Sequence, residues 1–457
     1  MANTYLTYTQ QSPSTVEGQK FTLSMWVKKS KNGSTQGLWG NTYSNTHRGY
    51  IYFSDDDTLR YYDSAGTNYA TTNKFRDSSG MYHIVVSVDT TLATSGDRIK
   101  MYKNGERITN FGTSTAPSQN DTMKLANTTN TPTMGRMVEA GTSYYFDGII
   151  SHAHLTQGYV YDATPFGETD STTGEWKIKT SVTGVTYGTN GFWWLKDSIA
   201  TTDHSTNSNT FSVGGGTLTK TEDCPSNVFA TMNPLANVVA PVGLESGNNT
   251  VSMTNSKGGI LSTLACTGGK YYAEMEIAAM PQDSRFHIGI MPHPVVNADD
   301  PINAGNDGIM LSGFNAVIYA NSGSGSAVLN NFYGNATGRF SGAPILGCAV
   351  DLESATKTMA ISINGAWVTG SNTTSTDFSN ALKVDISTPV ALEDDWFFGC
   401  GSGNSSGTTG VYNWNFGNGY FSTTAVTSAG TAGSTPGTFE YDVPSGYQPL
   451  STKGLNA

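Results

Sequence analysis

The sequence predicts an all-β protein made of two antiparallel β-sandwich domains in tandem. Nearly every apolar segment alternates with period two, or is a short run closed by Gly, Asn, Asp or Pro. Both patterns are typical of strands. No apolar segment keeps a helical period over three turns. Turn signals recur roughly every 8–12 residues, as they do in sandwiches and jelly rolls.

The clearest strand covers residues 21–27, and residues 81–88 and 98–103 have the same character. In the first of these, alternate apolar positions share one face, which predicts a half-buried strand. These positions are Phe21, Leu23, Met25 and Val27.

Two Asn-Gly dipeptides predict tight hairpins. Asn104 and Gly105 separate two strand-like runs, and Asn364 and Gly365 do the same later in the chain. Asn-Gly favours a type I′ turn because both central residues need a positive φ. Each dipeptide should therefore join two adjacent antiparallel strands.

The chain of 457 residues is long enough for two domains. Residues 206–245 are rich in Thr, Ser, Asn, Gly and Pro, so we expect a linker there. The domains would then cover 1–205 and 246–457. Similar strand patterns in both halves indicate two copies of related β-architecture.

Composition excludes several classes of protein. Charged residues make up 13 % of the chain, against about 25 % in ordinary globular proteins. The 19 Phe, 23 Tyr and 8 Trp are enough to build cores, so a disordered chain is not expected. The net charge is −11 and the basic residues form no cluster. Nucleic acid is therefore not an expected partner.

No secretory signal and no membrane-spanning run is recognisable in the sequence. We therefore expect no membrane insertion. The four cysteines are far apart and form no C-x-x-C pair. They are interpreted as buried free thiols, against the alternative of a metal or redox role.

Residues 81–106 resemble the laminin-G-like, concanavalin-A-like domains of marine bacteriophage virion proteins. Residues 145–150, 165–176 and 187–192 resemble them too, so the resemblance covers about 1–205. Met81 stands where family members usually have Trp. Further along, residues 269–277, 286–290, 346–352 and 361–367 are similar to strands of SPRY-type sandwiches, and this likeness covers about 246–457.

The resemblance implies a non-enzymatic virion protein, made in the host cytoplasm and exposed on the particle. It would be a tail fibre or receptor-binding appendage that contacts host surface glycans and other virion proteins. A homo-oligomer is expected, and a trimer by analogy with phage fibres. The alternatives are a capsid decoration or head fibre protein, and a polysaccharide depolymerase. Fold alone does not decide among these functions.

One Gly-rich loop region offers aromatic rings beside amide and hydroxyl groups, which is a carbohydrate-binding combination. The candidate ligand-binding residues are Trp39, Asn41, Tyr43, His47 and Tyr50. The alternative is that Trp39 and Tyr50 are core residues that flank an ordinary loop.

Two acidic turns are candidates for calcium, which prefers several oxygen ligands on a flexible backbone. The first contains Asp55, Asp56 and Asp57, and the second contains Asp299, Asp300 and Asp307. The alternative is a solvated turn that protects a strand edge.

Two further pairs of residues have the spacing of a functional site, but simpler interpretations are favoured. Glu274 and Glu276 lie two residues apart on one strand face, as an acid and a nucleophile of a retaining glycosidase would. A solvated strand face is the favoured interpretation, because the other face of the strand is apolar. His152 and His154 have the spacing for a shared metal, but a polar strand face is the favoured interpretation.

Overall fold

In a computed structural model, the chain forms two compact units. The first comprises Met1–Lys220 with Cys224–Ser226, and the second comprises Thr221–Asp223 with Asn227–Ala457. The described residues are 3–11, 14–126, 131–196, 201–238, 242–253, 258–281, 286–292, 308–313, 317–320, 327–329, 342–370, 373–387, 395–402, 409–430 and 437–456.

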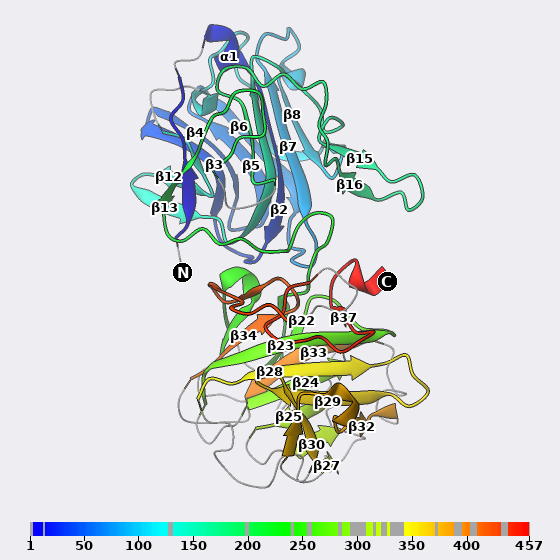
Figure 1. Ribbon diagram of the computed structural model, residues 1–457. Coiled ribbons are helices and arrows are strands. Elements are labelled where there is room, and N and C mark those ends of the chain that lie inside the picture. The colour runs from blue at the N-terminus through cyan, green and yellow to red at the C-terminus, as the bar shows by residue number, and fades with distance from the viewer. Residues whose placement is uncertain are drawn as a thin grey trace. The chain divides into compact units, whose positions relative to one another are not determined.

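The first unit is a sandwich of two antiparallel sheets (Figure 1). Within the described ranges, the larger sheet consists, in order, of β10 (Phe111–Thr115), β6 (Thr67–Lys74), β5 (Thr58–Asp63), β4 (His47–Phe53), β3 (Gln36–Ser44), β11 (Thr133–Met134), β1 (Tyr5–Thr7) and β18 (Ser212–Gly215). The smaller sheet consists of β17 (Phe192–Trp194), β14 (Gly148–Gln157), β2 (Lys20–Lys29), β7 (Tyr82–Asp89), β8 (Ile99–Lys103) and β9 (Glu106–Ile108).

Short elements complete this unit. They are the helix α1 (Thr15–Gln19), the 3₁₀ turns η1 (Ser95–Asp97) and η2 (Lys124–Ala126), and the hairpins β12 (Arg136–Glu139) with β13 (Thr142–Tyr145) and β15 (Gly167–Thr169) with β16 (Trp176–Ile178). Ser14 caps α1 through a capping box with Glu17. The β15–β16 hairpin projects from the sandwich (Figure 1).

The strand at residues 21–27 is confirmed as part of β2, but it is buried on both faces rather than on one. The predicted apolar positions do face the core between the sheets. On the opposite face, His83 of β7 stacks against Trp26 and accepts a hydrogen bond from Trp176 Nε1 at 3.0 Å. Thr22 receives a hydrogen bond from the backbone of Tyr161. The segment after β14 therefore covers the outer face that the alternation pattern left to solvent.

Both Asn-Gly hairpins are confirmed. Asn104 and Gly105 have φ values of 48° and 82° and join β8 to β9. Asn364 and Gly365 have φ values of 49° and 79° and join β29 (Thr358–Ile363) to β30 (Ala366–Gly370). An aromatic ring packs on each glycine, because an added Cβ would lie 2.4 Å from Trp176 at the first turn and 2.4 Å from Tyr441 at the second.

The second unit is also a sandwich of two largely antiparallel sheets. Among its described residues, one sheet runs β19 (Met232–Val238), β22 (Gly258–Ser262), β33 (Trp396–Ser402), β24 (Phe286–Pro292), β25 (Ile309–Ser312), β26 (Val317–Ala320) and β27 (Ala327–Leu329). The other runs β20 (Gly243–Glu245), β21 (Thr250–Met253), β34 (Gly410–Asn415), β23 (Lys270–Ala279), β28 (Ile345–Asp351), β29, β30 and β31 (Thr373–Ser375), with β32 (Val384–Asp385) on β29 and β37 (Gln448–Pro449) parallel to β23.

The outer face of β23 carries a small second core. Tyr272 of β23 and Trp367 of β30 pack with Phe439, Val443 and Tyr447 from the C-terminal segment. That segment therefore covers the sheet, as Figure 1 shows in red. The remaining small elements are β35 (Tyr420–Phe421), β36 (Thr424–Ala425), η3 (Ser246–Asn248), η5 (Phe378–Asn380) and η6 (Gly454–Asn456).

The division between the units falls inside the range predicted as linker, but 206–245 is not a free connection. Phe211 is buried in the first core, and β18 pairs with β1. Ala230 is buried in the second core, and β19 pairs with β22. Composition alone does not reveal these strands, because Gly, Ser, Thr and Asn occur in strands at the edge of a sheet as well as in linkers.

All four cysteines are free, and three are buried as expected. Cys224 is only partly buried. Burial raises the pKa of Cys400 to about 12, a shift that the hydrogen bond from Trp414 opposes. No helix within the described ranges is long and apolar enough to cross a membrane.

Candidate functional site

Three residues of the predicted aromatic site are buried. Trp39 is 2 % exposed and packs in the core near Phe192. Tyr50 is 1 % exposed, and its hydroxyl donates to the carbonyl of Val138 in β12. Asn41 is buried and donates to the carbonyl of Lys124 at 3.0 Å. The interpretation of Trp39 and Tyr50 as core residues therefore holds.

The other two candidates of that set lie at the β3–β4 turn. His47 opens β4, is partly buried, and pairs in register with Ser44. Tyr43 lies in β3, and its side chain is outside the described part of the structure. Among the described side chains of this region, Trp39 and Tyr50 are buried, so neither offers a ring to a ligand.

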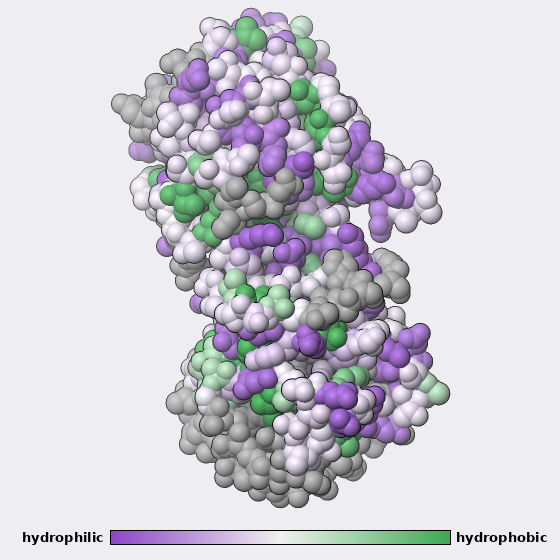
Figure 2. Space-filling view, in the orientation of Figure 1, coloured by the Kyte–Doolittle hydropathy of each residue, from purple (hydrophilic) through white to green (hydrophobic). Residues whose placement is uncertain are grey.

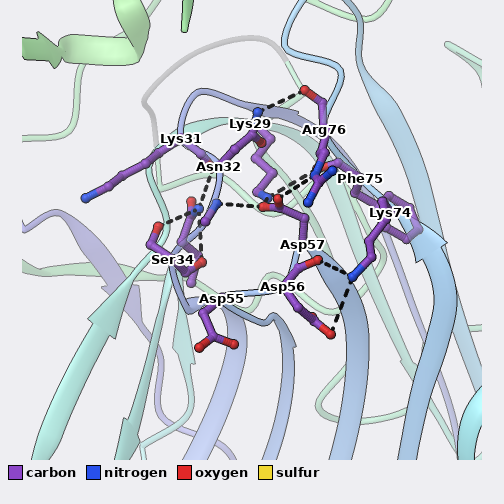
Figure 3. Close-up of polar contacts among 12 residues, drawn as sticks. Lys29, Lys31, Asn32, Ser34, Asp55, Asp56, Asp57, Lys74, Phe75 and Arg76 are labelled. Atoms are coloured by element: carbon purple, nitrogen blue, oxygen red, sulfur yellow. Dashed lines mark hydrogen bonds and ion pairs between the residues drawn. The ribbon is translucent and has the colours of Figure 1, made fainter. Parts of the chain in front are cut away.

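The acidic turn at Asp55–Asp57 lies between β4 and β5 and consists largely of ion pairs (Figure 3). Asp57 receives hydrogen bonds from Lys29 Nζ, from the backbone of Gly33 at 2.9 Å and from Arg76 Nε at 2.9 Å. Burial alone would raise the pKa of Asp57, but these hydrogen bonds outweigh burial and lower the pKa. The Asp57 carboxylate therefore stays ionised and paired.

Asp56 faces different cations. Its Oδ2 lies 3.2 Å from Arg60 Nη2 and 3.6 Å from Lys74 Nζ. Burial opposes ionisation, but hydrogen bonds from Thr58 prevail and lower the pKa of Asp56 to about 2. Asp55 accepts a hydrogen bond from Ser54 at 3.0 Å.

The three side chains of this turn thus do not converge. Among the described residues, no group of three His, Cys, Asp or Glu side chains could hold a metal ion. Calcium at this turn stays a prediction, and a bound ion would have to compete with the lysine and arginine partners. Asp299, Asp300 and Asp307 lie outside the described residues.

The two histidines of β14 are not a metal pair on one regular strand face. A bulge between Ser151 and His154 interrupts the register, and His152 has a φ of 45°. His154 is 2 % exposed and shares a 3.0 Å hydrogen bond with the hydroxyl of Tyr187. Burial, with the charges of His152 and His83, holds the pKa of His154 well below its usual range.

The expectation of a solvated face is wrong for Glu274. This side chain is fully buried beneath the C-terminal segment. Its oxygens accept from the backbone N–H groups of Glu440 and Tyr441, each at 2.9 Å, from Tyr272 Oη at 3.1 Å and from Asn415 Nδ2 at 3.3 Å. Burial raises the pKa of Glu274 to about 7 against the opposing effect of these hydrogen bonds.

Glu276 is partly buried and accepts from Asn413 Nδ2 at 2.7 Å. A glycosidase pair must reach its substrate with both carboxyl groups. Glu274 cannot, because the C-terminal segment encloses it. Glu274 therefore cannot serve as a catalytic carboxyl group in the depolymerase alternative.

A polar pocket on the first unit is a further candidate site. Its volume is about 490 Å³, and its described lining residues carry no charge. The lining residues are Gln11, Thr186, Tyr187, Gly188, Thr189, Thr206, Asn207 and Asn209. Such a volume suits a small molecule or one to a few sugar units.

Asp203 shapes one of the two loops of the pocket. Its Oδ1 accepts the backbone N–H groups of Trp193 and Ser205, each at 2.8 Å. Its Oδ2 accepts the backbone N–H of Asn209 and the hydroxyl of Ser205, each at 2.8 Å. Four donors on one carboxylate fix the loop 203–209 against β17.

Asn207 and Asn209 tie this loop to the loop 186–191. Asn207 Nδ2 donates to the carbonyls of Gly188 and Gly191, and Asn209 Nδ2 donates to those of Thr189 and Gly191. Among the described residues, no group donates to the Oδ1 atom of either asparagine. Each pocket-lining amide thus keeps an acceptor for a ligand hydroxyl.

Two glycines allow the loops to approach this closely. Gly188 has a φ of 69°, and a Cβ there would lie 2.0 Å from the carbonyl oxygen of Gln157 in β14. At Gly191, a Cβ would lie 2.0 Å from the carbonyl oxygen of Tyr187. Neither position can accept a side chain without moving the pocket wall.

Comparison with known proteins bears on the first unit. Residues 2–159 match the family model described as the concanavalin A-like lectin/glucanases superfamily. This part of the chain has a concanavalin A-like fold. The pocket loops 186–191 and 203–209 lie beyond the matched residues. No curated protein matches the chain.

Several solved structures are distantly similar. The SPRY domain of human HERC1 is 12 % identical, covering 40 % of this chain and 96 % of that one, with a TM-score of 0.28. A heptameric SAP-like pentraxin from Limulus polyphemus is 16 % identical, covering 35 % and 71 %, with a TM-score of 0.26. The carbohydrate-binding module CBM66 from Bacillus subtilis is 11 % identical, covering 39 % and 91 %, with a TM-score of 0.25. Scores this low carry no functional conclusion, and the SPRY-like character of the second unit stays a prediction.

Sequence reasoning missed the pocket. Residues 187–192 stood out only as part of a family resemblance, and residues from 206 onward only as a linker. A usable signal was the clustering of Gly188 and Gly191 beside a loop with two asparagines. What the sequence did not reveal is that these two stretches face each other.

Proposed function

We propose that the first unit binds glycans without cleaving them, and that the polar pocket is its binding site. The observation that carries this proposal is the uncharged lining, which offers hydroxyl groups and two unpaired carboxamide oxygens on a rigid wall. Sugars present closely spaced hydroxyl groups, which such neutral acceptors and donors recognise. The match of residues 2–159 to a superfamily of lectins and glucanases supports the same function.

Blocking the pocket tests the proposal. Thr206 lines the pocket, is exposed, and its side chain makes no described hydrogen bond. Thr206→Trp should fill the pocket without disturbing the fold and should abolish binding to a glycan array. Thr113→Trp is the matched control, because Thr113 is an exposed threonine on the edge strand β10. Equal loss in both variants, or retained binding in Thr206→Trp, would refute the pocket as the site.

We also propose the biological setting that the sequence resemblance implies. The chain would serve on a bacteriophage particle as a tail fibre or receptor-binding appendage that contacts host glycans and other virion proteins. A homo-oligomer would raise the avidity of a weak pocket without any new contact. Light scattering on the purified chain measures the copy number, for which a trimer is expected.

Antibody labelling of intact particles decides between this role and the alternative of a capsid decoration or head fibre. Label at the tail would support the appendage, and label over the shell would support the decoration protein. The absence of label from particles would overturn both.

A further inference from the structure

We propose that the pocket and the neighbouring exposed Tyr159 together select an uncharged oligosaccharide, with one sugar unit in the pocket and the next unit over Tyr159. This inference rests on the proposed function and specifies its ligand. Two independent observations carry it: the charges behind the pocket wall, and a group of exposed apolar side chains connected to that wall.

Two carboxylates accept hydrogen bonds from the pocket loops. Glu17 Oε1 accepts the backbone N–H of Thr189 at 3.2 Å, and Asp203 holds Asn209 from behind. Besides burial, the charge of Asp203 contributes to raising the pKa of Tyr187, so its field reaches the pocket wall. No lysine or arginine is among the described lining residues. A ligand carboxylate would therefore meet like charge without a compensating cation.

An apolar group adjoins the same wall. Val16, Tyr159 and Val160 are 52 %, 45 % and 37 % exposed. Figure 2 shows hydrophobic residues, singly and in small groups, among hydrophilic ones. Among the described residues, six large hydrophobic side chains are exposed, and three of them lie on α1 and directly after β14, two elements in contact, which indicates a contact surface.

Contacts of α1 and β14 connect this group to the pocket. Glu17, next to Val16, holds Thr189 of the pocket, and a Cβ on Gly158 would lie 3.5 Å from the Glu17 side chain. Gln157 N–H donates to the carbonyl of Tyr187 at 2.9 Å. Tyr159 follows two residues later, and its carbonyl is held by Thr156 Oγ1 at 2.9 Å.

This arrangement fits a ligand longer than one sugar. The hydroxyl-rich rim of the terminal unit matches the amide oxygens of the pocket. The apolar C–H face of the next unit matches an exposed aromatic ring, whose body is apolar and whose hydroxyl remains wet. A monosaccharide would use the pocket alone.

The test uses the full chain on an array of neutral and acidic mono- to tetrasaccharides, the acidic ones containing uronic or sialic acid. Neutral tri- and tetrasaccharides should bind best, and their uronic-acid counterparts should bind on the order of tenfold more weakly. Tyr159→Ala should weaken trisaccharide binding about three- to tenfold and leave monosaccharide binding unchanged. Val213→Ala, at another exposed apolar residue of this unit, is the control and should change neither.

A gain-of-function variant tests the charge argument separately. Thr186 lines the pocket and is exposed, so Thr186→Lys introduces the missing cation. Acidic glycans should then bind at least as well as neutral ones, while Thr113→Lys should leave the preference unchanged.

The outcomes separate the two proposals. Equal binding of acidic and neutral glycans by the unmodified chain, or an unchanged trisaccharide affinity in Tyr159→Ala, would overturn this inference while the glycan-binding function stands. Glycan binding that survives Thr206→Trp, or the absence of any glycan binding, would overturn the proposed function itself.

Discussion

Glu274 makes the stability of the C-terminal segment depend on pH. Its pKa is raised from 4.5 to about 7 by burial. A folded-state pKa above the unfolded value means that the folded state binds the proton more tightly. The stabilising contribution of the protonated carboxyl is therefore fully present below about pH 4.5 and is lost as the pH rises through about 7. The shift corresponds to about 3 kcal/mol.

Amide hydrogen exchange measures this pH dependence directly in the C-terminal segment that covers Glu274. The backbone N–H groups of Glu440 and Tyr441 donate to the Glu274 carboxyl group. Their opening free energy, corrected for intrinsic exchange rates, should fall by about 3 kcal/mol between pH 4.5 and pH 7.5.

Two variants provide the comparison. Glu274→Gln removes the titration and turns one amide nitrogen toward donor groups, so we expect a pH-independent loss of about 1–3 kcal/mol. Glu276→Gln changes a partly exposed carboxylate and should keep the slope of the unmodified chain. The reasoning is refuted if the opening free energy rises with pH, because the four donors would then hold the pKa down, or if Glu274→Gln keeps the slope.

Three further predictions concern backbone geometry, buried charge and thiol access. Gly188→Ala should lower the melting temperature and weaken glycan binding, because its methyl group would clash with β14. Gly184→Ala is the control, because Gly184 has a similar φ of 75° and open space around it. It should show only the backbone strain of a positive φ, roughly 1 kcal/mol. Lys29→Met should destabilise the first unit by about 3–5 kcal/mol in urea denaturation because its carboxylate partner stays buried, and Lys31→Met, at an exposed site, should be nearly neutral. In the native chain, a thiol reagent should modify Cys224 within minutes and the three buried cysteines only after denaturation; fast reaction of all four would contradict the burial.

The fold was largely predictable because strand periodicity and Asn-Gly turns are local signals. The alternation at residues 21–27 identified the core face of β2 correctly. It failed for the opposite face, where Trp26 and the residues around it lie under a segment that follows β14. The alternation of apolar residues along a strand shows which face is more apolar. It does not show whether a segment remote in the sequence covers the other face.

The candidate site was not predictable for the same reason. Trp39 and Tyr50 resemble exposed lectin aromatics in sequence, and only the structure shows that Trp39 packs against Phe192 of the other sheet and that Tyr50 lies beneath β12. Glu274 resembles a surface carboxylate until the C-terminal segment is placed over it. The pocket depends on Asn207 and Asn209 meeting Gly188 across two loops, a long-range contact without a local pattern.

The rings that rest on the two Asn-Gly turns also affect how the chain folds. Hairpins of this kind close within about 1–10 μs because their partners are neighbours in the chain. Trp176 and Tyr441, which rest on Gly105 and Gly365, come from segments far along the chain, and such contacts form more slowly. Each hairpin therefore forms early, and the segment that carries Trp176 or Tyr441 docks on it later. A side chain at either glycine would clash with the ring that rests on it, so the covering segment would dock more slowly and the folded state would also be less stable.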